Sequence, residues 1–178
     1  MEPSNYTVPE QFFTSGRSAF ITGQAVVLNE DAPKTGDLSD KVCVVTGGAG
    51  GIGSATVKRL AAEGAMVIIA DIPQMEERAK PLLNDKVSFM GADLTKPEAR
   101  KQLLEDIKAK HGRIDALINN AGITRDKTMK NMPEHYWDQV IAINLTAVIA
   151  LTEEALAMGL IPEGGRIIST SSISENEP

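Results

Sequence analysis

Residues 46–53 read Thr-Gly-Gly-Ala-Gly-Gly-Ile-Gly, and this glycine-rich stretch separates two segments of different periodicity. The run 41–46 before it is apolar and rich in β-branched residues, which predicts a buried strand. The segment 51–63 after it has a helical period, with Ile52, Thr56, Val57, Leu60 and Ala61 on one face. Gly64 then provides a typical C-terminal cap. The sequence therefore predicts a strand, a tight turn and a helix in direct succession.

The rest of the chain repeats this alternation of strand and helix. Further strands are predicted at 66–70, 87–90, 117–119 and 166–170, and helices at about 76–83, 95–110 and 133–158. Thr95, with Glu98 three residues later, predicts a capping box at the start of the helix 95–110. Such alternation is typical of a parallel sheet covered by helices on both faces, so we expect an α/β protein. The long helix 133–158 is expected to have an apolar side made of Trp137, Val140, Ile141, Val148 and Leu151.

Composition limits the classes of partner. The formal charge of −6 and a pI near 5.0 oppose nucleic-acid binding, which needs a basic surface. Cys43 is the only cysteine and lies in an apolar run, so it is interpreted as a buried hydrophobic residue in a reducing, cytoplasmic setting. Residues 1–20 lack the pattern of a signal peptide, and no stretch approaches the roughly 20 apolar residues that span a bilayer. We therefore expect neither nucleic acid nor a membrane as a partner.

The glycine-rich turn has the composition of a phosphate-binding loop. Glycines let the backbone approach a pyrophosphate closely, and the free N–H groups at a helix N-terminus stabilise its charge. A glycine-rich turn alone can be merely structural. Here the second predicted strand also ends in an acid, Asp71, eighteen residues beyond Gly53. A carboxylate at that place can accept hydrogen bonds from the ribose hydroxyls of a dinucleotide.

Three motifs in order carry a family resemblance. The spacing Thr-Gly-x-x-x-Gly-x-Gly at 46–53, the pair Asp93-Leu94 and the run 119–122, Asn-Asn-Ala-Gly, resemble the short-chain dehydrogenase/reductase family over about residues 41–175. The resemblance implies a Rossmann-type doubly wound parallel sheet of strand order 3-2-1-4-5 that is incomplete at its C-terminal edge. It also implies a nicotinamide cofactor and no metal. The residues expected to bind that cofactor are Gly47, Gly50, Gly51, Ile52, Gly53, Asp71, Asp93, Leu94, Asn120, Ala121 and Gly122.

We expect NAD(H) to be preferred over NADP(H). The carboxylate of Asp71 would repel a 2′-phosphate. In addition, Gly50 occupies the loop position at which phosphate-accepting members of the family often carry a basic residue.

Two further residues match catalytic positions of the family. Asn144 lies in the apolar stripe of the long helix, where an amide is either a satisfied buried side chain or, as the resemblance implies, the residue that holds a water in the proton relay. Ser172 follows the fifth strand in a serine cluster that could be a simple turn. The resemblance makes Ser172 the donor to the substrate carbonyl oxygen.

The segment 121–126, with Met132 further on, is similar to the 3-oxoacyl-[acyl-carrier-protein] reductases of the family. This similarity implies an oxidoreductase of fatty acid synthesis whose substrate is an acyl thioester on acyl carrier protein or CoA. The alternatives are a dehydrogenase of 3-hydroxyacyl-CoA or another secondary alcohol, and a non-catalytic nucleotide-binding fragment. The family also implies a homo-oligomer formed through the long helix.

The first 40 residues have a different organisation. Residues 21–24, Ile-Thr-Gly-Gln, resemble the last strand of the same fold, so 1–28 is interpreted as the tail of a preceding Rossmann-like domain, 29–40 as a linker and 41–178 as the N-terminal part of the family domain. This order resembles the high-molecular-weight tandem reductases, although residues 27–30, Val-Leu-Asn-Glu, depart from the usual Val-Asp-Gly-Gly. A circular permutant is the competing interpretation.

The family's proton donor, a Tyr with a Lys four residues later, has no counterpart in these 178 residues. Tyr6 and Tyr136 are followed at that spacing by Glu10 and Val140. Glu175 also stands where the family commonly has Gly. We therefore expect this chain to be a C-terminally truncated piece that is inactive alone.

Overall fold

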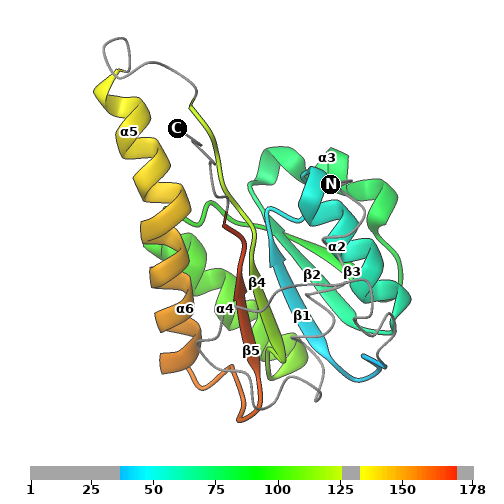
Figure 1. Cartoon of the computed structure of the whole chain (residues 1–178). Coiled ribbons are helices and arrows are strands. Elements are labelled where there is room, and N and C mark those ends of the chain that lie inside the picture. Colours follow the sequence, from blue (N-terminus) through cyan, green and yellow to red (C-terminus); the bar gives the residue numbers. More distant parts are fainter. Residues whose placement is uncertain (1–36, 126–132, 172–178) are drawn as a thin grey trace, which may run out of the picture.

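The fold is a single parallel sheet with helices on both faces (Figure 1). The computed structural model describes residues 37–125 and 133–171, and the structural statements below refer to these residues. The strand order β3-β2-β1-β4-β5 confirms the predicted fold class and topology, with every neighbouring pair parallel. Within the described part, β5 pairs with β4 alone, so its other edge is open. The strands are β1 (Val42–Thr46), β2 (Met66–Asp71), β3 (Val87–Gly91), β4 (Ala116–Asn119) and β5 (Arg166–Ser169).

The helices connect successive strands near the predicted positions. The segment between β2 and β3 forms a four-residue α-helix flanked by two 3₁₀ turns rather than one longer helix. Pro73 is the first residue of one 3₁₀ turn, and Pro81 is the second residue of the other. A π-helical stretch interrupts the long helix predicted at 133–158. The bounds are α2 (Gly51–Ala62), η3 (Pro73–Met75), α3 (Glu76–Ala79), η4 (Lys80–Leu82), α4 (Pro97–His111), α5 (Glu134–Ile141), the π-helix η6 (Ala142–Thr146) and α6 (Ala147–Ala157).

Two apolar cores, one on each face, hold the helices against the sheet. Alternate residues of β1 point to opposite faces, so Cys43 packs toward α2 while Val44 packs toward α4 and α6. Both faces of the central strands are therefore buried, which explains their nearly continuous apolar sequences. Leu38, inside the predicted linker, is also buried in the core on the α2 side.

Two local predictions are wrong. The capping box does not form: the helix begins at Pro97 after Lys96, and the hydroxyl of Thr95 donates to Asp93 Oδ1 at 2.6 Å instead. Ile52 does not join the buried face of α2 but is 66% exposed. Thr95 lies two residues before the helix and bonds to the loop residue Asp93, whereas Lys96 takes the N-cap position. Ile52 lies in the first turn of α2, where it lines a cavity at the carboxyl ends of the strands.

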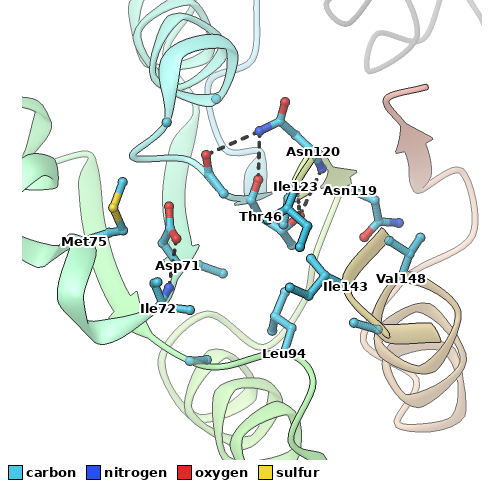
Figure 2. A pocket seen from close by; sticks show the side chains of 18 of the residues that line it. Thr46, Asp71, Ile72, Met75, Leu94, Asn119, Asn120, Ile123, Ile143 and Val148 are labelled. Atoms are coloured by element: carbon cyan, nitrogen blue, oxygen red, sulfur yellow. Dashed lines mark hydrogen bonds between the residues drawn. The ribbon is translucent and has the colours of Figure 1, made fainter. Parts of the chain in front are cut away.

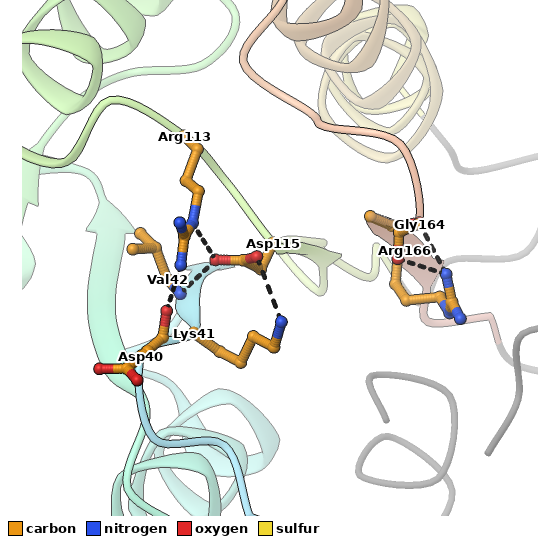
Figure 3. A network of polar contacts seen from close by, with 8 residues as sticks. Asp40, Lys41, Val42, Arg113, Asp115, Gly164 and Arg166 are labelled. Carbon is orange, nitrogen blue, oxygen red and sulfur yellow. Dashed lines mark hydrogen bonds and ion pairs between the residues drawn. The ribbon is translucent and has the colours of Figure 1, made fainter. Parts of the chain in front are cut away.

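The amino-terminal ends of β1 and β4 are joined by the carboxylate of Asp115 (Figure 3). Its Oδ2 accepts a hydrogen bond from the backbone N–H of Val42 at 2.9 Å and from Nε of Arg113 at 2.9 Å. Lys41 Nζ lies 3.7 Å from the other carboxylate oxygen. This network fixes the register of the two central strands at the end of the sheet opposite the glycine-rich turn.

The long helix is only partly covered. Ala147, Leu151 and Ala155 are buried in the core, whereas Trp137 and Ile141, predicted on the same apolar side, are 59% and 37% exposed. The helical segment Glu134–Ala157 has 24 residues and contains an 18-residue window of mean hydropathy 1.7, of which 17% is buried. By length and composition alone it therefore meets the test for a membrane span, contrary to the expectation from the sequence. This is weak support for a membrane segment, because core helices of soluble proteins pass the same test.

Candidate functional site

A cavity of about 660 Å³ lies at the carboxyl ends of the strands (Figure 2). In the sheet, β2 and β3 lie on one side of β1, and β4 and β5 lie on its other side. This is the switch point at which doubly wound sheets bind their ligands. The walls come from the glycine-rich turn, from the loops after β2, β3 and β4, and from η6 and the start of α6. All eleven residues predicted to bind a cofactor line this one cavity.

The turn after β1 can be built only with glycine at two positions. Gly47 has φ +63°, and a Cβ there would lie 2.8 Å from Cα of Ala121. A Cβ at Gly53 would lie 2.8 Å from Nδ2 of Asn120 and closer still to the carbonyl oxygen of Gly47. The backbone of the turn therefore packs directly against the loop after β4, and this leaves the first turn of α2 facing the cavity.

Thr46 and Asn120 lock these two loops together. The Thr46 hydroxyl accepts hydrogen bonds from the backbone N–H groups of Asn120 at 3.0 Å and Ala121 at 2.9 Å. In return, Nδ2 of Asn120 donates to the carbonyl of Thr46 at 3.1 Å. Figure 2 shows the two side chains facing each other at the top of the cavity. The wall made by the glycine-rich turn is thus fixed before any ligand binds.

Asp71 lies at the end of β2 and orders the turn as well as lining the cavity. Its Oδ2 accepts a hydrogen bond from the backbone N–H of Ala49 at 3.1 Å, and its Oδ1 accepts one from Ile72 at 2.9 Å. A carboxylate with two fixed backbone donors keeps a defined orientation. Unoccupied acceptor capacity remains on its oxygens for hydroxyl groups of a ligand.

The predicted catalytic residues have different outcomes. The Asn144 side chain, on η6, is exposed rather than buried, and its amide pairs with both backbone groups of Ile123: Oδ1 accepts from N–H and Nδ2 donates to the carbonyl, each at 2.9 Å. Ile123, on the loop after β4, and Ile143, next to Asn144 on η6, both line the cavity. Asn144 therefore joins the wall formed by that loop to the wall formed by the long helix. Ser172, Glu175 and Met132 lie outside the described residues, and the roles of Asn144 and Ser172 remain predictions.

The lining suits a dinucleotide by its shape and charge. The first-turn N–H groups of α2 have no intrahelical acceptor, and this end of the helix carries the positive end of its dipole. No acidic side chain stands in that first turn. Asp71 and Asp93 are the only charged residues among the described lining. Asp71 ends β2 and accepts from the Ala49 N–H of the glycine-rich turn, and Asp93 lies on the loop after β3. No group of three or more metal-ligating side chains occurs among residues 37–125 and 133–171.

The lining also includes residues that sequence reasoning missed. The ends of β2 and β4 add Ala70 and Asn119, which their positions at strand termini could have indicated. The helical residues could not have been found by spacing, because they reach the cavity only through the packing of the long helix on the sheet. The further lining residues are Thr46, Ile72, Met75, Ala92, Thr95, Ile123, Ile143, Ala147, Val148 and Leu151.

Known proteins resemble this chain in sequence. The acetoacetyl-CoA reductase of an Acinetobacter strain is 38% identical over 140 residues, which cover 75% of this chain and 56% of the relative. The 3-oxoacyl-[acyl-carrier-protein] reductase of Thermotoga maritima is 39% identical over 140 residues, which cover 76% of this chain and 57% of the relative. The chain thus spans less than two thirds of the length of either relative.

The structural comparison agrees. A short chain dehydrogenase from Burkholderia cenocepacia, crystallised in complex with NADP, has a TM-score of 0.70 and 35% identity, and the match covers 77% of this chain and 57% of that one. The short chain dehydrogenase family profile matches residues 41–178. These similarities cover the strands, the glycine-rich turn and the cavity described above, and the chain belongs to the short-chain dehydrogenase family of oxidoreductases.

Proposed function

We propose that this chain is the cofactor-binding part of an NAD(P)-dependent reductase that converts 3-oxoacyl thioesters to 3-hydroxyacyl thioesters in fatty acid synthesis. The observation that carries the proposal is the convergence of eleven predicted residues from four separate loops on one cavity. The relatives from Acinetobacter and Thermotoga are named as reductases of acyl thioesters, one on CoA and one on acyl carrier protein.

The chain's own residues bind and orient the cofactor in this proposal. The first turn of α2 receives the pyrophosphate, Asp71 accepts from the adenosine ribose, and Asp93 and Leu94 contact the adenine end. When bound, the nicotinamide ring supplies the hydride for the carbonyl carbon. Ser172 donates a hydrogen bond to the carbonyl oxygen as negative charge develops there.

These 178 residues contain no Tyr with a Lys four residues later to supply the proton for that oxygen. Tyr136 is on α5, and its successor at the family's spacing is Val140 rather than Lys. We propose that the complete protein supplies a Tyr-x-x-x-Lys beyond Ser172, and that Asn144 steadies the water that relays the proton. Domain boundaries at 28 and 40, a cytoplasmic location and a homo-oligomer belong to the same proposal.

We propose further that NAD(H) is preferred over NADP(H). The described lining has two carboxylates, Asp71 and Asp93, and no Lys, Arg or His to neutralise a 2′-phosphate. The Burkholderia protein was crystallised with NADP, so the two chains would differ in cofactor preference.

Two alternatives have a specific basis. The relative from Acinetobacter favours a CoA thioester as strongly as the Thermotoga relative favours acyl carrier protein, since their identities are 38% and 39%. The lack of a Tyr-x-x-x-Lys in the sequence favours a non-catalytic nucleotide-binding fragment. Kinetics with both thioesters on a chain that carries the missing motif distinguish these alternatives.

Cofactor binding by the chain itself tests the proposal directly. We expect NADH to bind to the 178-residue chain with an increase in its fluorescence, and ADP-ribose to displace it. Gly53→Ala should abolish this binding, because the added Cβ would lie 2.8 Å from Asn120 Nδ2 and force the loops apart. Ala55→Ser, which adds one atom at an exposed position of the same helix, is the control. Failure of the folded wild-type chain to bind either ligand would refute the proposed function.

A further inference from the structure

Arg100 is the one charged residue that is buried in the described part of the chain. It lies on α4 and is only 7% exposed, and the other buried polar residues are two threonines and Asn119. Removing a guanidinium from water is unfavourable unless its donors are matched by acceptors. The acceptors that Arg100 contacts therefore indicate why the residue is buried.

The guanidinium of Arg100 contacts two different elements. Nε lies 3.1 Å and 3.0 Å from the two carboxylate oxygens of Glu154 on α6, and Nη2 donates to Oε1 at 2.8 Å. The remaining nitrogen, Nη1, donates to the backbone carbonyl of Leu94 at 2.9 Å. The ion pair with Glu154 thus fixes the plane of the guanidinium, and its free edge is directed at the loop after β3.

That loop forms one wall of the cavity and is held at its other positions. Asp93 Oδ1 accepts hydrogen bonds from both the N–H and the hydroxyl of Thr95, at 3.0 Å and 2.6 Å. The N–H of Ala92 donates to the carbonyl of Asp71 at 2.7 Å. The carbonyl of Leu94 is the point at which the loop is tied to the helices behind it.

Glu154 connects the same guanidinium to a second wall of the cavity, formed by the long helix. Leu151, one helical turn before Glu154, lines the cavity, as do Ala147 and Val148. Figure 2 shows Leu94 below the cavity near Ile143, which belongs to the η6 part of the long helix. Arg100 therefore links the loop after β3 to the long helix, although it does not itself line the cavity.

We propose that Arg100 is a positioning residue of the cofactor site: held by Glu154, it fixes the Leu94 carbonyl and keeps the loop 92–96 in the shape that receives the adenosine end of a dinucleotide. This inference rests on the proposed function, because it takes the cavity to bind a nicotinamide dinucleotide. A preformed wall lowers the ordering cost of binding.

Binding measurements on a double variant test the inference. Arg100→Met with Glu154→Leu replaces the ion pair by apolar side chains, a change that often leaves stability intact because no unpaired charge stays buried. The Leu94 carbonyl loses its donor, so we expect Kd for NADH to rise about three- to tenfold, the scale of one ordinary hydrogen bond. Lys101→Met with Glu105→Leu removes an exposed ion pair from the same helix and should leave Kd unchanged.

Ligand fragments separate positioning from a general loosening of the fold. ADP-ribose should weaken by the same factor as NADH, whereas reduced nicotinamide mononucleotide, which lacks adenosine, should bind equally to wild type and variant. Equal weakening of all three ligands would overturn the inference, and so would an unchanged Kd for NADH in the folded double variant.

A second variant tests the inference even if the double variant does not fold. Arg100→Lys keeps the charge for Glu154, but a single ammonium group cannot reproduce the fork that also reaches Leu94. We expect it to weaken NADH and ADP-ribose alike, and unchanged binding by this variant would overturn the inference too. If the wild-type chain binds none of the ligands, the proposed function fails instead.

Discussion

Asp71 has two tasks at one edge of the cavity. Its carboxylate holds the glycine-rich turn through the N–H of Ala49 at 3.1 Å, and it remains part of the cavity lining. A 2′-phosphate at this edge would meet a fixed negative charge with no basic residue among the described lining. The charge and the fixed position of Asp71 thus both support the proposed preference for NAD(H).

We predict that the chain binds NADH more tightly than NADPH, and that Asp71→Ser reduces the difference. Repulsion between two partly exposed charges at an effective dielectric constant near 20 amounts to a few kcal/mol at most, so we expect roughly a tenfold preference or more. Titrations of both cofactors against wild type and variant measure it. Tighter binding of NADPH by the wild-type chain would contradict the prediction.

Cys43 is chemically silent in the folded protein. Burial in β1, and secondarily the charge of Asp115, raises the pKa of its thiol to about 12 from an ordinary value of 9.0. Since the thiolate is the nucleophile, the folded chain has almost none of the reactive form at neutral pH. The cysteine is thus a core residue, as its apolar surroundings in the sequence predict.

We predict that a thiol reagent at pH 8 does not modify Cys43 until the chain is unfolded in urea. Because the folded pKa lies above the unfolded one, the stabilising contribution of the neutral thiol is complete below pH 9.0 and declines as pH rises toward about 12. Rates of labelling with and without urea check this. Rapid labelling of the native chain would mean that β1 opens far more readily than its burial suggests.

At the scale of elements, the long helix presents a broad apolar surface to solvent. Leu145, Ile149 and Leu156 are 51%, 48% and 50% exposed, and together with Trp137 and Ile141 they recur at intervals of four and seven residues. Such spacing places side chains on one side of a helix. A contiguous exposed apolar surface typically marks a protein interface, which supports the proposed homo-oligomer.

We predict that Ile149→Glu shifts the chain from an oligomer to a monomer, because a carboxylate buried between two apolar surfaces has no partner. Size-exclusion chromatography with light scattering measures the change in mass. Ala109→Glu places the same charge on an exposed position of α4 and should leave the mass unchanged. A wild-type chain that stays monomeric at every concentration would contradict the prediction.

At the scale of the whole molecule, the described residues form the walls of the cavity, but the sequence lacks the proton donor that the proposed reaction needs. The walls that would hold a cofactor are fixed by hydrogen bonds among the described residues. The proton donor required by the proposed reaction has no counterpart in the sequence, and the outer edge of β5 has no partner within the described part. Cofactor binding and turnover should therefore be separable.

We predict that the 178-residue chain binds NADH but does not reduce acetoacetyl-CoA above the rate in buffer, because a positioned acid contributes roughly 10²–10⁴-fold to such a step. A chain extended by a family segment with Tyr-x-x-x-Lys should turn over, and changing that Tyr to Phe should abolish activity. Turnover by the 178-residue chain would overturn the proposed mechanism.

In the extended chain, Ser172→Ala should lower kcat by roughly 100-fold with little change in cofactor affinity.

The sequence alone determined the alternation of strands and helices, the strand order implied by the family resemblance, and the residues of the glycine-rich turn. The alternation and the glycine-rich turn depend on local periodicity and short spacings, which can be read directly from the sequence, whereas the strand order rested on the family resemblance. The sequence did not determine where the helix Pro97–His111 begins, because Lys96 takes the N-cap position and the Thr95 hydroxyl donates to Asp93. It placed Trp137 on the apolar side of the long helix, but an apolar period does not say what covers that side, and Trp137 is 59% exposed.

Only the tertiary structure decided which side chains meet across the cavity. Met75 and Val148 line it together although they are far apart in the chain. Arg100 reaches Glu154 across 54 residues of sequence. Such contacts arise when helices from different parts of the chain pack on one sheet, and their energies depend on distance and burial. Neither quantity can be read from residue order, because both are set by the packing of the whole fold.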